Sequence, residues 1–262
     1  MNWTLHFLEA EGSLAKWRER LTAEACETHD RIAAHLPDDA IMSAVDVVIE
    51  RVSGRTIPEL GLGGHAFRRG CMIITLDPEN PNFEASLAAG QFTRTVTHEF
   101  HHCLRHAGAG YGTTLGEAIV SEGLADHFDQ QINGGSGQIW NHALEGRHWS
   151  EILRFAEYEI DDADYNHDKW FYGANGPADQ NPIPRWCGYT IGYHLLERYF
   201  AVHGHARAAR MAGTPAHEII SEVWSALAQR QADQEASPLV TARKTAAHSA
   251  RPARDHQPTA AR

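Results

Sequence analysis

Residues 91–106 read QFTRTVTHEFHHCLRH and contain the pattern His98-Glu99-x-x-His102. Apolar side chains recur at helical spacing through this stretch, which predicts an amphipathic helix. In a helix, residues four apart lie on one face with their Cβ atoms about 6 Å from each other. The imidazoles of His98 and His102 can therefore reach a single metal ion, and Zn²⁺ accepts neutral imidazole nitrogen as a ligand.

The residue between the two histidines has a different expected role. Glu99 projects beside the ligand pair, where it can take a proton from a water that the metal activates. His101 points away from His98, so we expect it to pack or to face solvent, and we expect His106 to support the end of the helix. A third histidine ligand six residues after His102 is excluded, because that position is Gly108.

A second predicted helix supplies carboxylates. Residues 115–128 read LGEAIVSEGLADHF, and their apolar positions recur at helical spacing. Glu122 and Asp126 are four residues apart beside this apolar stripe. A carboxylate near a protein core needs a positive partner or a metal, since an unpaired buried charge is costly. Glu122 is therefore the candidate third ligand, and Asp126 a candidate supporting group.

The rest of the chain predicts an α+β, mainly helical fold. Residues 13–36 have helical periodicity that ends at Pro37, and the β-branched run at 44–52 predicts a strand. Residues 61–67 and 71–76 flank Arg68-Arg69-Gly70 and predict a hairpin-like pair. After Asn82 the period changes to that of a helix, and it continues to about residue 229. We therefore expect a small N-terminal mixed sheet followed by helices.

Composition limits the domain organisation and the partners. Residues 231–262 have no aromatic side chain, which predicts a disordered tail after one domain at 1–230. The net charge of −11 argues against nucleic acid as a partner. No membrane span or secretory signal is evident, so we expect no membrane partner and a soluble, cytoplasmic protein. The oligomeric state is left open by the sequence.

Three segments together resemble a known family. They are the helix motif HEFHH at 98–102, SEGLAD at 121–126 and WCGYTIGY at 186–193. The first two are similar to the gluzincins, the zincins whose third ligand is a glutamate, and the full set is similar to the DUF2268 family of predicted zinc-dependent proteases. The resemblance extends over roughly residues 13–225.

The resemblance implies both a fold and a ligand set. It implies a zincin (gluzincin)-like fold with an active-site helix, in which His98, His102 and Glu122 hold the zinc and Glu99 is the general base. It implies that Asp126 orients a ligand imidazole, which we expect to be that of His98. It also implies that residues 71–76 form the sheet edge above the cleft, along which an extended peptide can add as a strand.

A further group is expected to stabilise the oxyanion, because gluzincin sites often use a tyrosine or histidine outside the metal helices. Tyr189 and Tyr193 lie four residues apart at the start of a predicted helix at 188–200. Of the two we favour Tyr189, which is nearer the proline-containing loop before the helix, and His194 is a weaker alternative. A phenol that donates to the developing charge is worth a few kcal/mol.

These observations predict a zinc metallopeptidase that holds one Zn²⁺ per chain and hydrolyses the peptide bonds of a peptide or protein substrate. The alternative is a catalytically silent zinc-binding regulatory or protein-interaction module of the same fold. A third possibility is hydrolysis of a small amide, which depends on the depth of the pocket.

Overall fold

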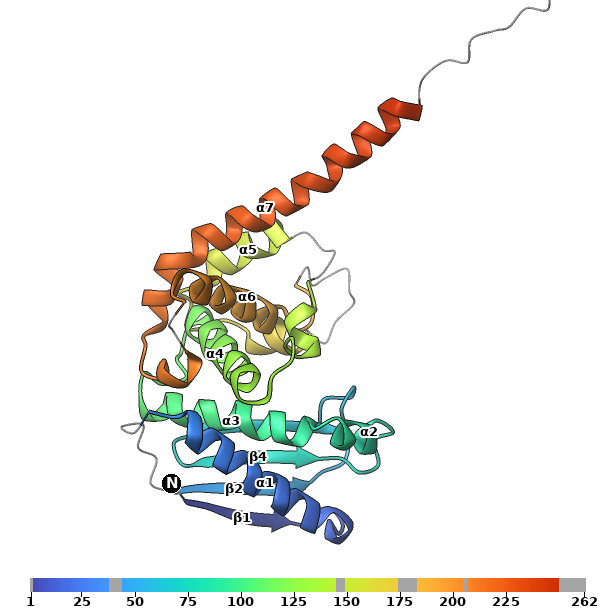
Figure 1. Ribbon diagram of the computed structural model, residues 1–262, viewed down its shortest axis with the longest axis vertical. Helices are drawn as coiled ribbons and strands as arrows, with labels where there is room; N and C mark the ends of the chain where they lie inside the picture. The colour runs from blue at the N-terminus through green and yellow to red at the C-terminus, as the bar shows by residue number, and fades with distance from the viewer. Residues whose placement is uncertain (1, 38–43, 145–148, 174–182, 205–206, 250–262) are drawn as a thin grey trace, which may run out of the picture.

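Four strands of the described chain form one mixed sheet in the order β1-β2-β4-β3 (Figure 1). Their bounds are Asn2–Leu8 for β1, Ala44–Arg51 for β2, Leu62–Arg68 for β3 and Cys71–Leu76 for β4. β1, β2 and β4 run parallel to one another, and β3 pairs antiparallel with β4. The predicted pair at 61–67 and 71–76 is confirmed. The strand β1 was not predicted.

The structure is a computed structural model that describes residues 2–37, 44–144, 149–173, 183–204 and 207–249, with side chains to residue 235. Helix α1 lies between β1 and β2 in the chain and the other helices follow the last strand, so the α+β and mainly helical class is confirmed. Their bounds are Ala15–His35 (α1), Phe83–Ala88 (α2), Gln91–Ala107 (α3), Leu115–Asn133 (α4), Trp149–Glu159 (α5), Cys187–Val202 (α6) and Ala216–Ser249 (α7). Three short helical segments are Ile139–His142 (η1), the π-helix Asp168–Tyr172 (η2) and Ala208–Arg210 (η3).

Helices α1 and α3 pack on the same face of the sheet. Trp3 on β1 points to this face, where its ring lies 5.3 Å from that of His29 on α1 and 5.5 Å from that of Phe100 on α3. Buried residues alternate along β2 as expected for a strand covered on one face. Helix α3 thus lies between the sheet and α4, which packs in turn against α6 (Figure 1).

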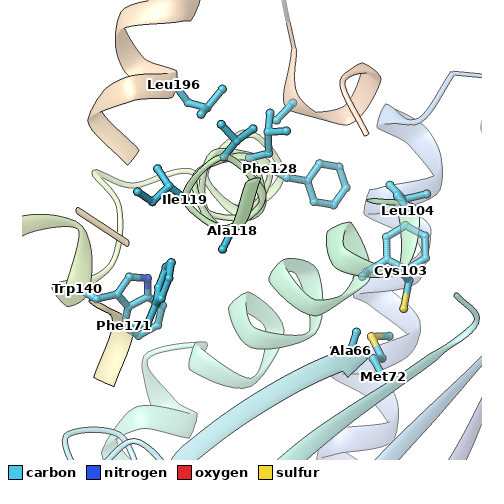
Figure 2. Close-up of a cluster of buried hydrophobic side chains, with 14 of the residues drawn as sticks. Ala66, Met72, Cys103, Leu104, Ala118, Ile119, Phe128, Trp140, Phe171 and Leu196 are labelled. Atoms are coloured by element: carbon cyan, nitrogen blue, oxygen red, sulfur yellow. The ribbon is translucent and has the colours of Figure 1, made fainter. Parts of the chain in front are cut away.

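The hydrophobic core is continuous through these layers. Figure 2 shows Met72 and Ala66 of the sheet facing Cys103 on α3, and it also shows Ile119 of α4 and Leu196 of α6, which belong to the same core. All five side chains are at least nine-tenths buried. The core therefore fixes α3 and α4 relative to each other, and these are the two helices that carry the candidate ligands.

Helices α4 and α6 cross at a contact between two glycines. A Cβ atom added at Gly123 would lie 2.3 Å from the carbonyl oxygen of Gly192, and a Cβ atom at Gly192 would lie 2.3 Å from that of Ile119. Because the obstructing atoms are backbone, the two helices would have to separate to accept any side chain at these positions.

We expect Gly123→Ala to lower the free energy of unfolding by about 1–3 kcal/mol through overpacking. Urea denaturation followed by circular dichroism measures the change. Gly213→Ala is the control, since a Cβ there meets no atom within 4 Å, and its expected effect is within about 0.5 kcal/mol. Equal stability of the two variants would contradict the close crossing.

Helix α7 extends past the expected domain boundary at residue 230. Gln231 is buried, and Glu235 accepts hydrogen bonds from the backbone N–H and the hydroxyl of Ser150 on α5. Helix α7 continues from there to Ser249 and does not end at the expected boundary, while the disordered tail at 231–262 stays a prediction. Residues 250–262 lie outside the described residues, and the division into one domain and a tail stays a prediction.

Within the described ranges, no helix combines the length and the apolar character needed to cross a bilayer. The expected cytoplasmic location stays a prediction.

Candidate metal centre and cleft

Helices α3 and α4 bring three potential metal ligands together. His98 Nε2 lies 3.0 Å from Glu122 Oε2 and 3.1 Å from His102 Nε2, and the third distance, from His102 Nε2 to Glu122 Oε2, is 3.4 Å. These three residues form a group that can hold a metal ion. The sequence predicted the group from the spacing on α3 and from the carboxylate on α4.

The spacing of the three atoms fits a tetrahedral zinc site. Nitrogen and oxygen ligands at about 2.0–2.1 Å from Zn²⁺ lie about 3.3–3.4 Å from one another when the coordination is tetrahedral. The observed separations of 3.0, 3.1 and 3.4 Å are close to the distances expected between ligands of one zinc ion. Two imidazoles and one carboxylate are also a ligand set found in catalytic zinc sites.

Glu122 is fixed by a residue that sequence reasoning missed. Its second carboxylate oxygen accepts a hydrogen bond of 2.7 Å from the hydroxyl of Tyr111. Tyr111 lies in the glycine-rich loop between α3 and α4, and its carbonyl accepts a bond of 2.6 Å from Ser121 Oγ. The loop therefore orients the carboxylate, and nothing in its irregular sequence indicated this role.

Asp126 lies on the far side of the His98 ring from Glu122. Asp126 Oδ1 is 3.0 Å from His98 Nδ1. The carboxylate also accepts hydrogen bonds from Trp140 Nε1 at 3.1 Å and from Asn141 Nδ2 at 2.5 Å. Segment η1 supplies both donors, which the sequence did not predict. This network holds the carboxylate against the imidazole, an arrangement that orients histidines in metal sites.

The charges at the centre are strongly coupled. Burial acts to lower the pKa of His98, but hydrogen bonds to Asp126 and Glu122 outweigh it and hold the pKa well above its usual value. Burial acts to raise the pKa of Glu122, whereas the facing rings of His102 and His98 hold this pKa well below its usual value. Glu122 therefore presents a negative charge to the two rings, as a cation ligand must.

Glu99 lies beside the three ligand atoms and has an unused oxygen. Its Oε2 atom is buried and has no hydrogen-bond partner among the described residues. Burial raises the pKa of this carboxyl, and the rings of His102 and His98 offset part of the effect. A buried acceptor without a partner is rare in folded proteins. Its presence fits a group whose partner is a water or a substrate atom.

Strand β3 approaches Glu99 through Gly64. A Cβ atom at Gly64 would lie 2.7 Å from Glu99 Cγ, so only glycine allows this contact. Leu62 O accepts a bond from Ile57 N, and Ala66 O accepts one from His106 Nε2, both on the side away from β4. Because peptide groups alternate along a strand, Gly64 turns its N–H and C=O to the same free side.

The edge strand beside Glu99 is therefore β3, Leu62–Arg68, whereas β1 forms the opposite edge of the sheet. The resemblance implied that residues 71–76 form the edge above the cleft, and this is wrong. β4 lies between β2 and β3 and is hydrogen-bonded on both sides, so it has no free edge.

Two cavities meet at the centre, one of about 500 Å³ and one of about 350 Å³. Glu99, His98 and Gly64 line both of them. The larger cavity extends toward Arg94 and Asp129, and the smaller one extends toward Tyr111 and His106. Together they form a cleft that continues past the candidate ligands on both sides.

The two candidate tyrosines lie in different places. Tyr189 lines both cavities, and burial raises its pKa well above the usual value, so its hydroxyl stays protonated. Tyr193 lies outside the cleft, with its ring stacked on His127 at 4.4 Å and its hydroxyl donating to Gln130. The oxyanion role expected for Tyr193 therefore has no support in the geometry.

The remaining candidates have structural contacts. His101 is buried and bonds the carbonyl of Ala208, so it packs as expected. His194 pairs with Glu197 and lines neither cavity.

Tyr172 lines both cavities but was not predicted, because it lies on the π-helix η2, which has no simple sequence period. Such π segments are frequent at functional sites.

Comparison with known proteins identifies the family. A family model described as "Predicted Zn-dependent protease (DUF2268)" matches residues 13–221, which include α3, α4 and the edge strand β3. No curated protein and no solved structure gives a significant match to the chain. The match covers most of the sequence, and the chain belongs to the DUF2268 family of predicted Zn-dependent proteases.

Proposed function

We propose that the chain is a zinc-dependent metallopeptidase with a zincin-like, gluzincin-type fold. His98, His102 and Glu122 would hold one Zn²⁺ per chain. The observation that carries the proposal is the cluster of three ligand atoms, 3.0–3.4 Å apart, beside the unpartnered Oε2 atom of Glu99. The expected substrate is a peptide or a protein.

The residues around the centre have separate proposed roles. When bound, the zinc supplies Lewis acidity, which polarises a carbonyl and lowers the pKa of water. Glu99 accepts the proton of the attacking water and then passes it to the leaving amine as general acid. The raised pKa of Glu99 suits this exchange near neutral pH, because proton transfer is most efficient when the catalytic pKa is near the working pH.

Tyr189 is the proposed oxyanion donor. Its hydroxyl is kept protonated in the cleft, so it can donate a hydrogen bond to the charge that develops on the scissile carbonyl oxygen. Asp126 acts through His98 as a positioning residue, since its carboxylate is held by Trp140 and Asn141.

We expect an extended peptide to bind along β3. Gly64 offers a free N–H and C=O next to Glu99, and main-chain hydrogen bonds at a sheet edge are a common way to bind extended peptides. Pairing at this edge would place a backbone carbonyl of the substrate beside Glu99.

Removal of the metal tests the proposed reaction. We expect the full chain, loaded with zinc, to cleave members of a peptide library, and we expect 1,10-phenanthroline to abolish cleavage. The isomer 1,7-phenanthroline, which does not chelate, is the matched control, and added zinc should restore activity. A clean zinc-loaded preparation that cleaves no peptide would contradict the proposal and favour a catalytically silent binding module.

Asp126→Asn is expected to weaken zinc binding by about 10- to 100-fold, the usual cost of losing a group that orients a ligand histidine. Competition with a chromophoric chelator measures the dissociation constant. Asp161→Asn is the control, because Asp161 is exposed and lies on a turn beyond α5. Unchanged affinity in Asp126→Asn would remove Asp126 from its positioning role.

A further inference from the structure

The smaller cavity, on the His102 side of Glu99, has walls made of rings. Its volume is about 350 Å³. Apart from the candidate ligands, the aromatic side chains that line it are His65, Phe67, His106, Tyr111, His167, Tyr172 and Tyr189. Among its described lining residues there is no lysine or arginine.

These rings are held in place by contacts with one another and with the core ring of Phe171. His106 stacks on Tyr111 with centroids 6.5 Å apart, and His167 stacks on Phe171 at 4.4 Å. Tyr111 is also tied to Glu122 by its hydroxyl. The cavity is therefore preformed, so a side chain that enters it orders few protein groups.

Away from Glu99 and the candidate ligands, the walls of this cavity carry no charge. Burial lowers the pKa values of His65, His106 and His167, so these imidazoles are uncharged at neutral pH. Both oxygens of Glu122 already face Tyr111 or His98, which leaves no free carboxylate at the Tyr111 wall for a cationic side chain. The larger cavity differs because charged side chains line it, namely Arg55, Arg94, Arg185, Glu50 and Asp129.

One ring of the smaller cavity is conspicuously exposed. Phe67 on the edge strand β3 is 79% exposed and stacks on His65, at 4.6 Å. Tyr172, on η2, lines the same cavity and is 55% exposed. Large apolar side chains that stay exposed beside a cavity are typical of binding surfaces.

We propose that this cavity binds an aromatic side chain of the peptide substrate, and that Phe67 is a residue that determines this specificity. The inference rests on the proposed peptidase function in one respect, namely that the bound peptide is a substrate. A phenyl ring gains edge-to-face or offset contacts with Phe67 and Tyr172, which favours aromatic over small or charged side chains.

Binding to a Glu99→Gln variant of the full chain tests this without turnover. The probes are two dye-labelled heptapeptides with blocked ends, one of alanine with a central phenylalanine and one of alanine alone, followed by fluorescence anisotropy. We expect the phenylalanine peptide to bind more tightly. Adding Phe67→Ala should reduce its affinity by about twofold to tenfold and leave the alanine peptide unchanged.

The control is Tyr158→Ala in the same background, since Tyr158 is 91% exposed on α5 and lines neither cavity. The inference would be overturned if the two peptides bound equally or if neither bound. It would also be overturned if the preference for the phenylalanine peptide persisted in the Phe67→Ala variant. Measurements with and without added zinc, together with cleavage by the parent chain, separate the two proposals. A phenylalanine preference without any cleavage would contradict the peptidase and retain the aromatic cavity.

Discussion

Replacing Glu99 with glutamine is expected to lower kcat for peptide hydrolysis by about 10²- to 10⁴-fold, the usual contribution of a general base. The amide has nearly the same shape as the carboxylate but cannot accept the proton of the attacking water. Glu99 is outside the cluster of His98, His102 and Glu122, so the variant should keep its zinc. Steady-state kinetics on a peptide found in the library screen, with elemental analysis, measures both quantities.

Glu151→Gln makes the same chemical change at an exposed position on α5 and should leave kcat unchanged. Undiminished activity in Glu99→Gln would exclude Glu99 as the base. Loss of zinc together with activity would instead assign Glu99 to metal binding.

The second large effect is expected for Glu122→Ala, which should lose zinc during purification. The substitution removes one of three ligand atoms and leaves two imidazole nitrogens 3.1 Å apart. A chelate of three protein groups binds zinc far more tightly than two histidines can, because each ligand is already held in place by the fold. Elemental analysis of protein purified without added metal or an affinity tag measures zinc per chain, with about one equivalent expected in the parent.

Glu157→Ala is the matched control, since it removes an exposed glutamate on α5. Retention of zinc at the parental level in Glu122→Ala would contradict the three-ligand site. If the parent itself takes up no zinc after incubation with the metal, the histidines of α3 have a structural role only.

Much of the fold follows from periodicity. Helices α1, α3, α4 and α6 each repeat apolar residues at helical spacing, and this property can be read locally. The order of the strands cannot be read in this way. β4 pairs with β2, which is more than twenty residues away in sequence, and this pairing removes its free edge. β1 does alternate between exposed and half-buried residues. One short alternating run does not show by itself which strand it pairs with.

The residues of the candidate centre that lie on regular helices could be predicted from the sequence. The four-residue spacing of His98 and His102 is a direct consequence of helix geometry, and Glu122 lies on a second regular helix. The groups that orient these side chains come from irregular segments. Tyr111 lies in a loop and Trp140 on η1, so their positions depend on tertiary packing. Gly64 lies in a glycine-rich stretch that stands out in the sequence. The need for glycine at this position follows from its close contact with Glu99, which the sequence does not show.

Because the candidate ligand atoms are divided between α3 and α4, zinc bound by them would link metal supply to the stability of the folded chain. α3 packs on the sheet and α4 on α6, so an ion held by both helices binds the folded chain and has no such site in the unfolded one. By mass action, free zinc at 100 times its dissociation constant would raise the free energy of unfolding by about 2.7 kcal/mol. The melting temperature then reports metal occupancy, and a shortage of zinc would increase the fraction of unfolded chains open to degradation.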